Sequence, residues 1–178
     1  ADPEKEMVAL GQTYFAVQTR KQELFEQASE NEKRVILRQE MRMHNKHLSA
    51  TAQEAGVETS LDFAIFQNHG YKGLYGGLDA QGIKKRKGLS KSQNILDHMG
   101  STELAANLFR ATQTDEKIKR ERIQGKNQAN KAHYEVGQKV RKTIQELGGT
   151  MPEELPTVDS IKNLERKQQR TLKEKKDD

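Results

Sequence analysis

The amino-acid sequence predicts an all-α protein: a long antiparallel helix pair, a compact helical bundle, a basic amphipathic helix and a charged C-terminal tail. Two observations carry this prediction. Apolar residues recur at spacings of three and four along much of the 178-residue chain, which is the period of an α-helix. Hydrophobic residues make up 33% and charged residues 32% of the chain, a ratio typical of long solvated helices around one modest core.

Residues 1–56 are expected to form a long helical hairpin. Pro3 suits a helix start, and the first helix should run over about residues 4–27. A second helix should follow an Asn31 N-cap and end before Gly56, and the short polar link between them favours antiparallel packing. The apolar seam of the first helix is also the candidate surface for pairing between subunits, and its residues are Met7, Leu10, Tyr14, Val17 and Leu24.

The central domain is expected to span residues 57–150. It should begin with a short, buried helix over residues 61–66, capped by Thr59 or Ser60 and closed at residues 68–70. Four glycines within residues 70–77 predict a structured loop. Helices are then expected over residues 78–85, 90–98, 101–112 and about 115–124.

The strongest amphipathic pattern in the chain covers about residues 127–147 and ends at a glycine pair. One stripe of this helix is apolar, whereas Lys131, Lys139 and Lys142 project from the opposite half. Residues 151–178 are expected to form a proline-containing linker and a charged, partly disordered helix.

Positive charge is concentrated in the middle of the chain. The net charge is +5, but residues 72–142 carry +9, while residues 1–71 carry −3 and residues 143–178 carry −1. A local excess of this size attracts polyanions, so a nucleic acid or an acidic protein surface is the expected partner. Lysine enrichment that only maintains solubility remains an alternative.

The densest basic run lies beside the glycine-rich segment. Its lysines and arginine could contact phosphates, or they could be a solvated helix end that complements the helix dipole. The two neighbouring tyrosines could stack on unpaired bases, although rings that cover the core are the favoured interpretation. The candidate nucleic-acid-binding residues are Lys84, Lys85, Arg86, Lys87, Lys91, Lys131, Lys139, Lys142, Tyr71 and Tyr75.

Patterns for catalysis and metal binding are weak. Cysteine is absent, which suits a cytoplasmic protein, and no apolar stretch or leader predicts a membrane or secreted location. Glu40, His44 and His47 share a helical face without forming a zinc motif. His133 is expected to be a hydrogen-bonded core histidine or one at the edge of the surface, rather than a metal ligand. We therefore expect no metal, no cofactor and no enzyme activity. A metal-dependent nuclease remains the second alternative, and its candidate carboxylates are Asp79, Asp97 and Glu103.

Four segments resemble one known family. They are residues 11–20 (GQTYFAVQTR), 62–75 (DFAIFQNHGYKGLY), 96–114 (LDHMGSTELAANLFRATQT) and 147–156 (LGGTMPEELP). Together they resemble the bacterial DNA-damage-inducible protein D family. The resemblance implies a cytoplasmic, nucleoid-associated product of the SOS response without known catalytic activity. It also implies an antirepressor-like domain before this region, and it carries no site residues over to this chain.

The resemblance further implies a role in recombinational repair. The expected partners are single-stranded DNA, a RecA-type recombinase filament, or both. The first hypothesis is therefore a regulatory protein that modulates the recombinase through a basic surface. The alternative is a homo-oligomerising structural module that uses the apolar seam without contacting DNA.

Overall fold

The computed structural model describes residues 25–177, and these residues form helices, turns and irregular segments without any strand. The predicted all-α class is confirmed. The first predicted helix lies almost wholly outside the described residues, and all five seam residues do so. The elements are α3 (Glu30–Glu54), α4 (Ser60–Leu74), α5 (Ala80–Lys87), η1 (Ile95–His98), α6 (Ser101–Arg120), α7 (Lys126–Glu146), η2 (Pro152–Glu154) and α8 (Lys162–Asp177).

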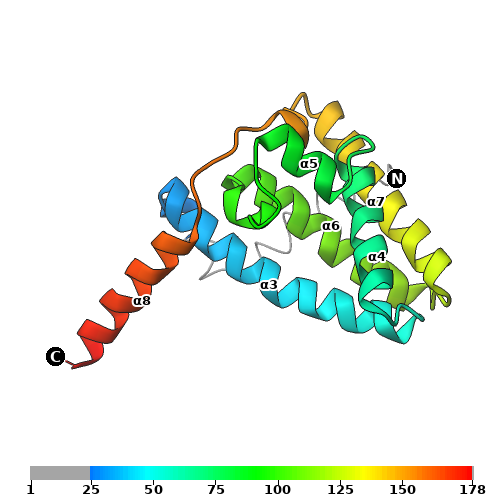
Figure 1. Cartoon of the computed structure of the whole chain (residues 1–178), viewed down its shortest axis with the longest axis horizontal. Helices are drawn as coiled ribbons and strands as arrows, with labels where there is room; N and C mark the ends of the chain where they lie inside the picture. Colours follow the sequence, from blue (N-terminus) through cyan, green and yellow to red (C-terminus); the bar gives the residue numbers. More distant parts are fainter. Residues whose placement is uncertain (1–24, 178) are drawn as a thin grey trace.

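Two helix pairs form the body of the protein. Helix α4 packs along α7, α3 packs along α6, and α6 also contacts α7 (Figure 1). One continuous core joins these helices and crosses the boundary predicted at residue 56. Its members include Leu37 and Met41 of α3, Phe66 and Leu74 of α4, Leu104 and Leu108 of α6, and Val136 and Val140 of α7.

The glycine-rich segment is not the loop that the sequence predicts. Thr59 caps α4 with a capping box, as expected, but the helix continues through Gly70 and Gly73 to Leu74. Both glycines face α7 at close range. A Cβ atom on Gly137 of α7 would lie 2.7 Å from the carbonyl oxygen of Gly70, so the two backbones approach too closely for side chains. The glycines serve this close approach, and only Gly76 and Gly77 form a turn with positive φ.

Several other boundaries differ from the prediction. The N-cap of α3 is Ser29 instead of Asn31. Residues 101–120 form the single helix α6, because no glycine or proline interrupts them. Within it, the Thr114 hydroxyl donates to the Arg110 carbonyl. Of residues 90–98, only Ile95–His98 are helical, as a 3-10 turn. The predicted buried helix over residues 61–66 is amphipathic instead, since Phe66 is buried but Leu61 is 69% exposed.

An extended strap connects the body to α8. Residues 155–161, which follow η2, cross η1 and the start of α3, and Ile161 at the end of the strap is fully buried. The strap is held by hydrogen bonds between Lys87 Nζ and the Leu155 carbonyl (3.1 Å), the Val158 amide and the His98 carbonyl (3.0 Å), the Ile161 amide and the Asp97 carbonyl (2.9 Å), and an Arg34 guanidinium nitrogen and the Asp159 carbonyl (2.7 Å). Beyond the strap, α8 projects away from the body (Figure 1).

Candidate nucleic-acid interface

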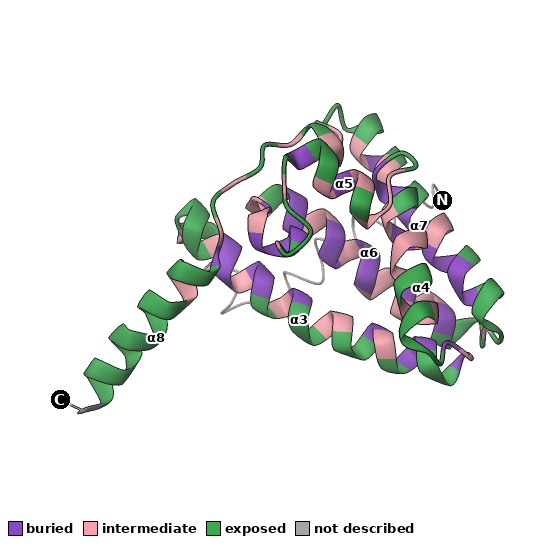
Figure 2. Cartoon of the chain, viewed as in Figure 1, coloured by how far each residue is buried: buried purple, intermediate pink, exposed green. Residues whose placement is uncertain are grey.

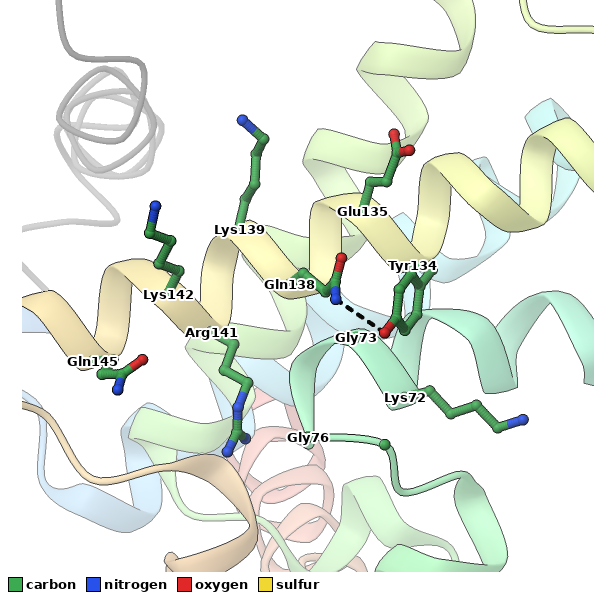
Figure 3. A pocket seen from close by; sticks show the side chains of 11 residues that line it. Lys72, Gly73, Gly76, Tyr134, Glu135, Gln138, Lys139, Arg141, Lys142 and Gln145 are labelled. Carbon is green, nitrogen blue, oxygen red and sulfur yellow. Dashed lines mark hydrogen bonds between the residues drawn. The ribbon is translucent and has the colours of Figure 1, made fainter.

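A groove of about 640 Å³ lies between the C-terminal end of α4 and the outer face of α7 (Figure 3). We call it the α7 groove. The residues of α7 that line the groove recur three and four positions apart, because residues at these spacings share one face of a helix. The groove is lined by Lys72, Gly73, Gly76 and Gly77 from α4 and the following turn, and by Tyr134, Glu135, Gln138, Lys139, Arg141, Lys142 and Gln145 from α7.

Lysines flank the α7 groove on both sides. Lys139 and Lys142 point to one side of α7, and Lys72 points away from them on the α4 side (Figure 3). All three are exposed. The structure shows no ion pair for Lys72 or Lys139 among residues 25–177, whereas Lys142 lies 4.0 Å from Glu146. The groove therefore presents cations around Tyr134, whose hydroxyl accepts a hydrogen bond from Gln138 at 2.9 Å.

Arg141 connects α7 with α4 and η2 at one end of the groove. Its guanidinium donates to both carboxylate oxygens of Glu153, at 2.7 and 2.8 Å, and to the Leu74 carbonyl at 3.2 Å. The hydrogen bond with Glu153 raises the pKa of Arg141. Burial alone would raise the pKa of Glu153, but the hydrogen bonds from Arg141 and the nearby charge of Arg86 lower it. Arg141 thus fixes η2 against α4.

A second basic surface lies on α5 and the loop after it. Lys85, Arg86 and Lys91 are exposed there, while half-buried Lys84 donates to the Lys91 carbonyl at 2.8 Å. We call these four residues the α5 cluster. The charge of Arg86 lowers the pKa of Glu153, the ion-pair partner of Arg141, so this member of the α5 cluster lies near the ion pair at the end of the α7 groove.

Lys87 and Tyr75 are not available to a nucleic acid. For Lys87 this corrects the candidate assignment, whereas for Tyr75 it agrees with the favoured interpretation of a ring that covers the core. As whole residues they are 8% and 1% exposed, and both side chains bind Glu103 in the core. Lys87 Nζ lies 2.6 Å from Glu103 Oε1, and the Tyr75 hydroxyl donates to the other oxygen. Burial raises the pKa of Glu103, whereas the hydrogen bonds from Lys87 and Tyr75 oppose this rise. A buried carboxylate needs such hydrogen-bond partners, so the side chains of Lys87 and Tyr75 stabilise the core and do not face solvent.

Two candidates remain, Tyr71 and Lys131, and they differ in exposure. Tyr71 is half-buried, with the Arg110 guanidinium 5.1 Å from its ring centroid. Its ring therefore packs on the interior network, as the favoured interpretation predicts. Lys131 is exposed and lies 3.9 Å from Glu135, an exposed pair of the kind that contributes little to stability.

The structure separates the carboxylates that a nuclease would need. Asp79 caps α5, Asp97 pairs with Arg38 at 3.0 Å, and Glu103 binds Lys87. Within the described part of the chain, no three histidine or acidic side chains gather as metal ligands would. Among the same residues, no helix is both long and apolar enough to span a membrane.

His133 is a core histidine, which is one of the two positions that the sequence left open. It is fully buried, and its Nε2 lies 2.5 Å from an Arg110 guanidinium nitrogen. Since that nitrogen can only donate, Nε2 must accept, and Nδ1 donates to the Phe66 carbonyl at 2.8 Å. Burial, assisted by the charge of Arg110 and by His69, holds the pKa of His133 well below its ordinary value. The ring is therefore neutral in the folded protein.

We expect acid to destabilise the fold through His133. Well above a pH of about 6.5 the ring is neutral in both the folded and unfolded chains, and this contribution to stability is complete. Below it, only the unfolded chain takes up the proton, so the free energy of unfolding should fall by up to about 1.4 kcal/mol per pH unit. Urea unfolding between pH 7.5 and 5 measures this slope. His133→Gln should have a shallower slope, although His44, whose pKa burial also lowers, keeps its share; equal slopes would contradict the assignment.

The sequence of this chain is similar to sequences of known proteins. The profile of the DinD C-terminal domain matches residues 28–164. The chain belongs to this family. Over 170 residues it is also 66% identical to DNA damage-inducible protein D of Escherichia coli (strain K12), a stretch that covers 92% of this chain and 62% of that relative. The chain thus spans less than two thirds of the relative's length, and the family resemblance read from the sequence is confirmed.

Two residues of the α7 groove were not among the sequence candidates. Tyr134 shares a face with Gln138 and Lys142 at four-residue spacing, so the helical pattern of α7 could have included it. Lys72 had no such signal, because it lies in the segment that the sequence predicts as a loop. Its place beside α7 depends on the packing of α4.

Proposed function

We propose that this chain is a regulatory, non-enzymatic protein of the DNA-damage response that modulates a RecA-type recombinase on single-stranded DNA. It would act in the cytoplasm, at the nucleoid. Family membership supports the damage-response role, because the E. coli relative is named DNA damage-inducible. The resemblance to the family supports the recombinase as the target.

The observation that carries the proposal is the set of exposed cations without a carboxylate partner among the described residues. Lys72 and Lys139 flank the α7 groove, and Lys85, Arg86 and Lys91 belong to the α5 cluster. Phosphates would replace the counterions of such side chains, and the released ions would favour binding at low salt. Half-buried Tyr134 adds an aromatic ring in the groove, and stacking on aromatic rings is how proteins hold unpaired bases.

A titration of fluorescently labelled single-stranded DNA tests the binding surface. We expect the affinity to fall as salt rises, with a log–log slope of about −0.7 for each phosphate contacted. Lys72→Gln with Lys139→Gln should weaken binding by about tenfold or more at 0.1 M salt, because two contacts are lost. Fluorescence anisotropy at several salt concentrations measures both effects.

The matched control is Lys46→Gln with Arg122→Gln, which removes the same charge from exposed sites on α3 and just after α6, where the structure shows no ion pair among the described residues. Neither of these residues lines the α7 groove. The control should bind almost as the wild type does. Equal losses in the two variants would mean that net charge alone governs binding. A wild-type chain that binds neither the strand nor a recombinase filament would refute the proposed function.

A further inference from the structure

Helix α8 is the most solvent-exposed helix of the described chain. From residue 166 to residue 176 every side chain is exposed, which Figure 2 shows as an almost unbroken green ribbon. Its contacts with the body lie near its start, where Glu165 accepts from Arg42 at 2.8 Å and Lys162 lies 3.9 Å from Asp97. The strap ending at buried Ile161 anchors this start. The body therefore positions α8 and leaves most of its length to solvent.

The same helix is strongly basic. Lys162–Asp177 contains seven lysines and arginines against three acidic residues, a net charge of +4 in 16 residues. The net charge summed over residues 143–178 does not reveal this local excess. Residues 143–178 sum to −1 because Glu146, Glu153, Glu154 and Asp159 precede the helix and Asp178 follows it in the sequence.

Most of the positive charge of α8 lies on one face. At about 100° per residue, five cations fall within an arc of about 120°. This arc, which we call the α8 stripe, consists of Lys162, Arg166, Arg170, Lys173 and Lys176. The structure shows no ion pair for the last four among residues 25–177. The other face contains Leu164, Thr171 and Leu172, together with the two remaining lysines, Lys167 and Lys175.

The composition of the α8 stripe favours a phosphate backbone over a protein surface. Protein interfaces bury apolar and aromatic anchors and are depleted of lysine at their centre. The α8 stripe contains no apolar side chain, because Leu164 and Leu172 lie on the other face. Cations four residues apart are separated by about 6 Å along the axis, and the whole α8 stripe extends for about 21 Å. Such a row can contact several phosphates in succession.

We propose that α8 is a nucleic-acid-binding arm whose stripe contacts successive phosphates of single-stranded DNA. The choice of DNA rests on the proposed function, whereas the place of the contact rests on the geometry of α8. The arm adds a second cationic surface to that of the α7 groove.

Two double variants of the full chain, matched in charge, test the proposal. Arg166→Gln with Lys173→Gln removes two charges from the centre of the α8 stripe. Lys167→Gln with Lys175→Gln removes two charges from the opposite side of the same helix. All four side chains are exposed, so folding should not change, and circular dichroism checks this. Fluorescence anisotropy with labelled single-stranded DNA is the readout.

Losing two phosphate contacts should reduce the magnitude of the log–log salt slope by about 1.4 and the affinity at 0.1 M salt by about 25-fold. The opposite-face variant should lose less than about threefold, through the general field alone. Equal losses in both variants would overturn the proposal.

The remaining outcomes separate this proposal from the proposed function. If the wild type binds the strand and the stripe variant binds it equally well, the α8 arm is refuted while the proposed function stands. If the wild type binds only recombinase filaments, the nucleic-acid assignment of α8 is refuted, and a loss in the stripe variant would mark α8 as a protein contact. If the wild type binds neither, both proposals fail.

Discussion

Glu103→Ala should lower the free energy of unfolding by about 3–5 kcal/mol, because it leaves the Lys87 ammonium buried without its carboxylate. Lys87 Nζ lies 2.6 Å from Glu103, and the two side chains are 2% and 1% exposed. The Tyr75 hydroxyl would lose its acceptor as well. Urea unfolding followed by circular dichroism measures the loss.

A second variant separates the lost ion pair from the lost volume. Lys87→Met combined with Glu103→Leu removes both charges and keeps apolar side chains in their place. Buried ion pairs replaced in this way often leave stability unchanged or higher, so the double variant should recover most of the loss. A change of less than about 1 kcal/mol for Glu103→Ala alone would show that Lys87 finds water or another partner.

Gly73→Ala is expected to lower the free energy of unfolding by about 2 kcal/mol, in the middle of the usual range for overpacked cores. The new Cβ would meet the Tyr134 carbonyl oxygen, with the Gln138 amide nitrogen 3.0 Å away. These are backbone atoms of α7, so the two helices would have to move apart. Denaturant unfolding of the variant measures the cost, which should exceed the gain in helix propensity of about 1 kcal/mol.

Gly82→Ala in α5 is the matched control for this substitution. It is also a helical glycine with negative φ, but its Cβ would meet mainly the Leu78 side chain, at 3.2 Å, which can move. We expect unchanged or slightly higher stability, since alanine favours the helix. Equal effects at the two positions would contradict the close approach of α4 and α7.

The difference between these two glycines explains where the sequence prediction was wrong. A glycine-rich segment predicts a loop when only local conformation is considered. The helix through Gly70 and Gly73 becomes apparent only with Gly137, which lies more than 60 residues later in the chain. In contrast, residues 127–147 have a continuous apolar stripe, and α7 matches that prediction within one residue at each end.

In the candidate site too, features that depend on nearby residues could be predicted, whereas contacts between distant helices could not. Charge predicted a basic surface, and exposed Lys85, Lys91 and Lys139 agree with it. The burial of Tyr75 agrees with the favoured interpretation of its ring. Burial of Lys87 could not be predicted, because Glu103 reaches it from another helix. The α8 stripe is a local pattern that the regional charge obscured, and counting charge per helix would have found it.

Recombinase filaments assembled on single-stranded DNA give the most direct test of the proposed regulation. The wild-type chain would be added to preformed filaments, and their persistence followed by light scattering at several salt concentrations. We expect the chain to change the filament lifetime at low salt, with a weaker effect at high salt because ions screen the basic surface. A filament lifetime that is the same with and without the chain, at every salt concentration, would contradict the proposal that this protein modulates a recombinase.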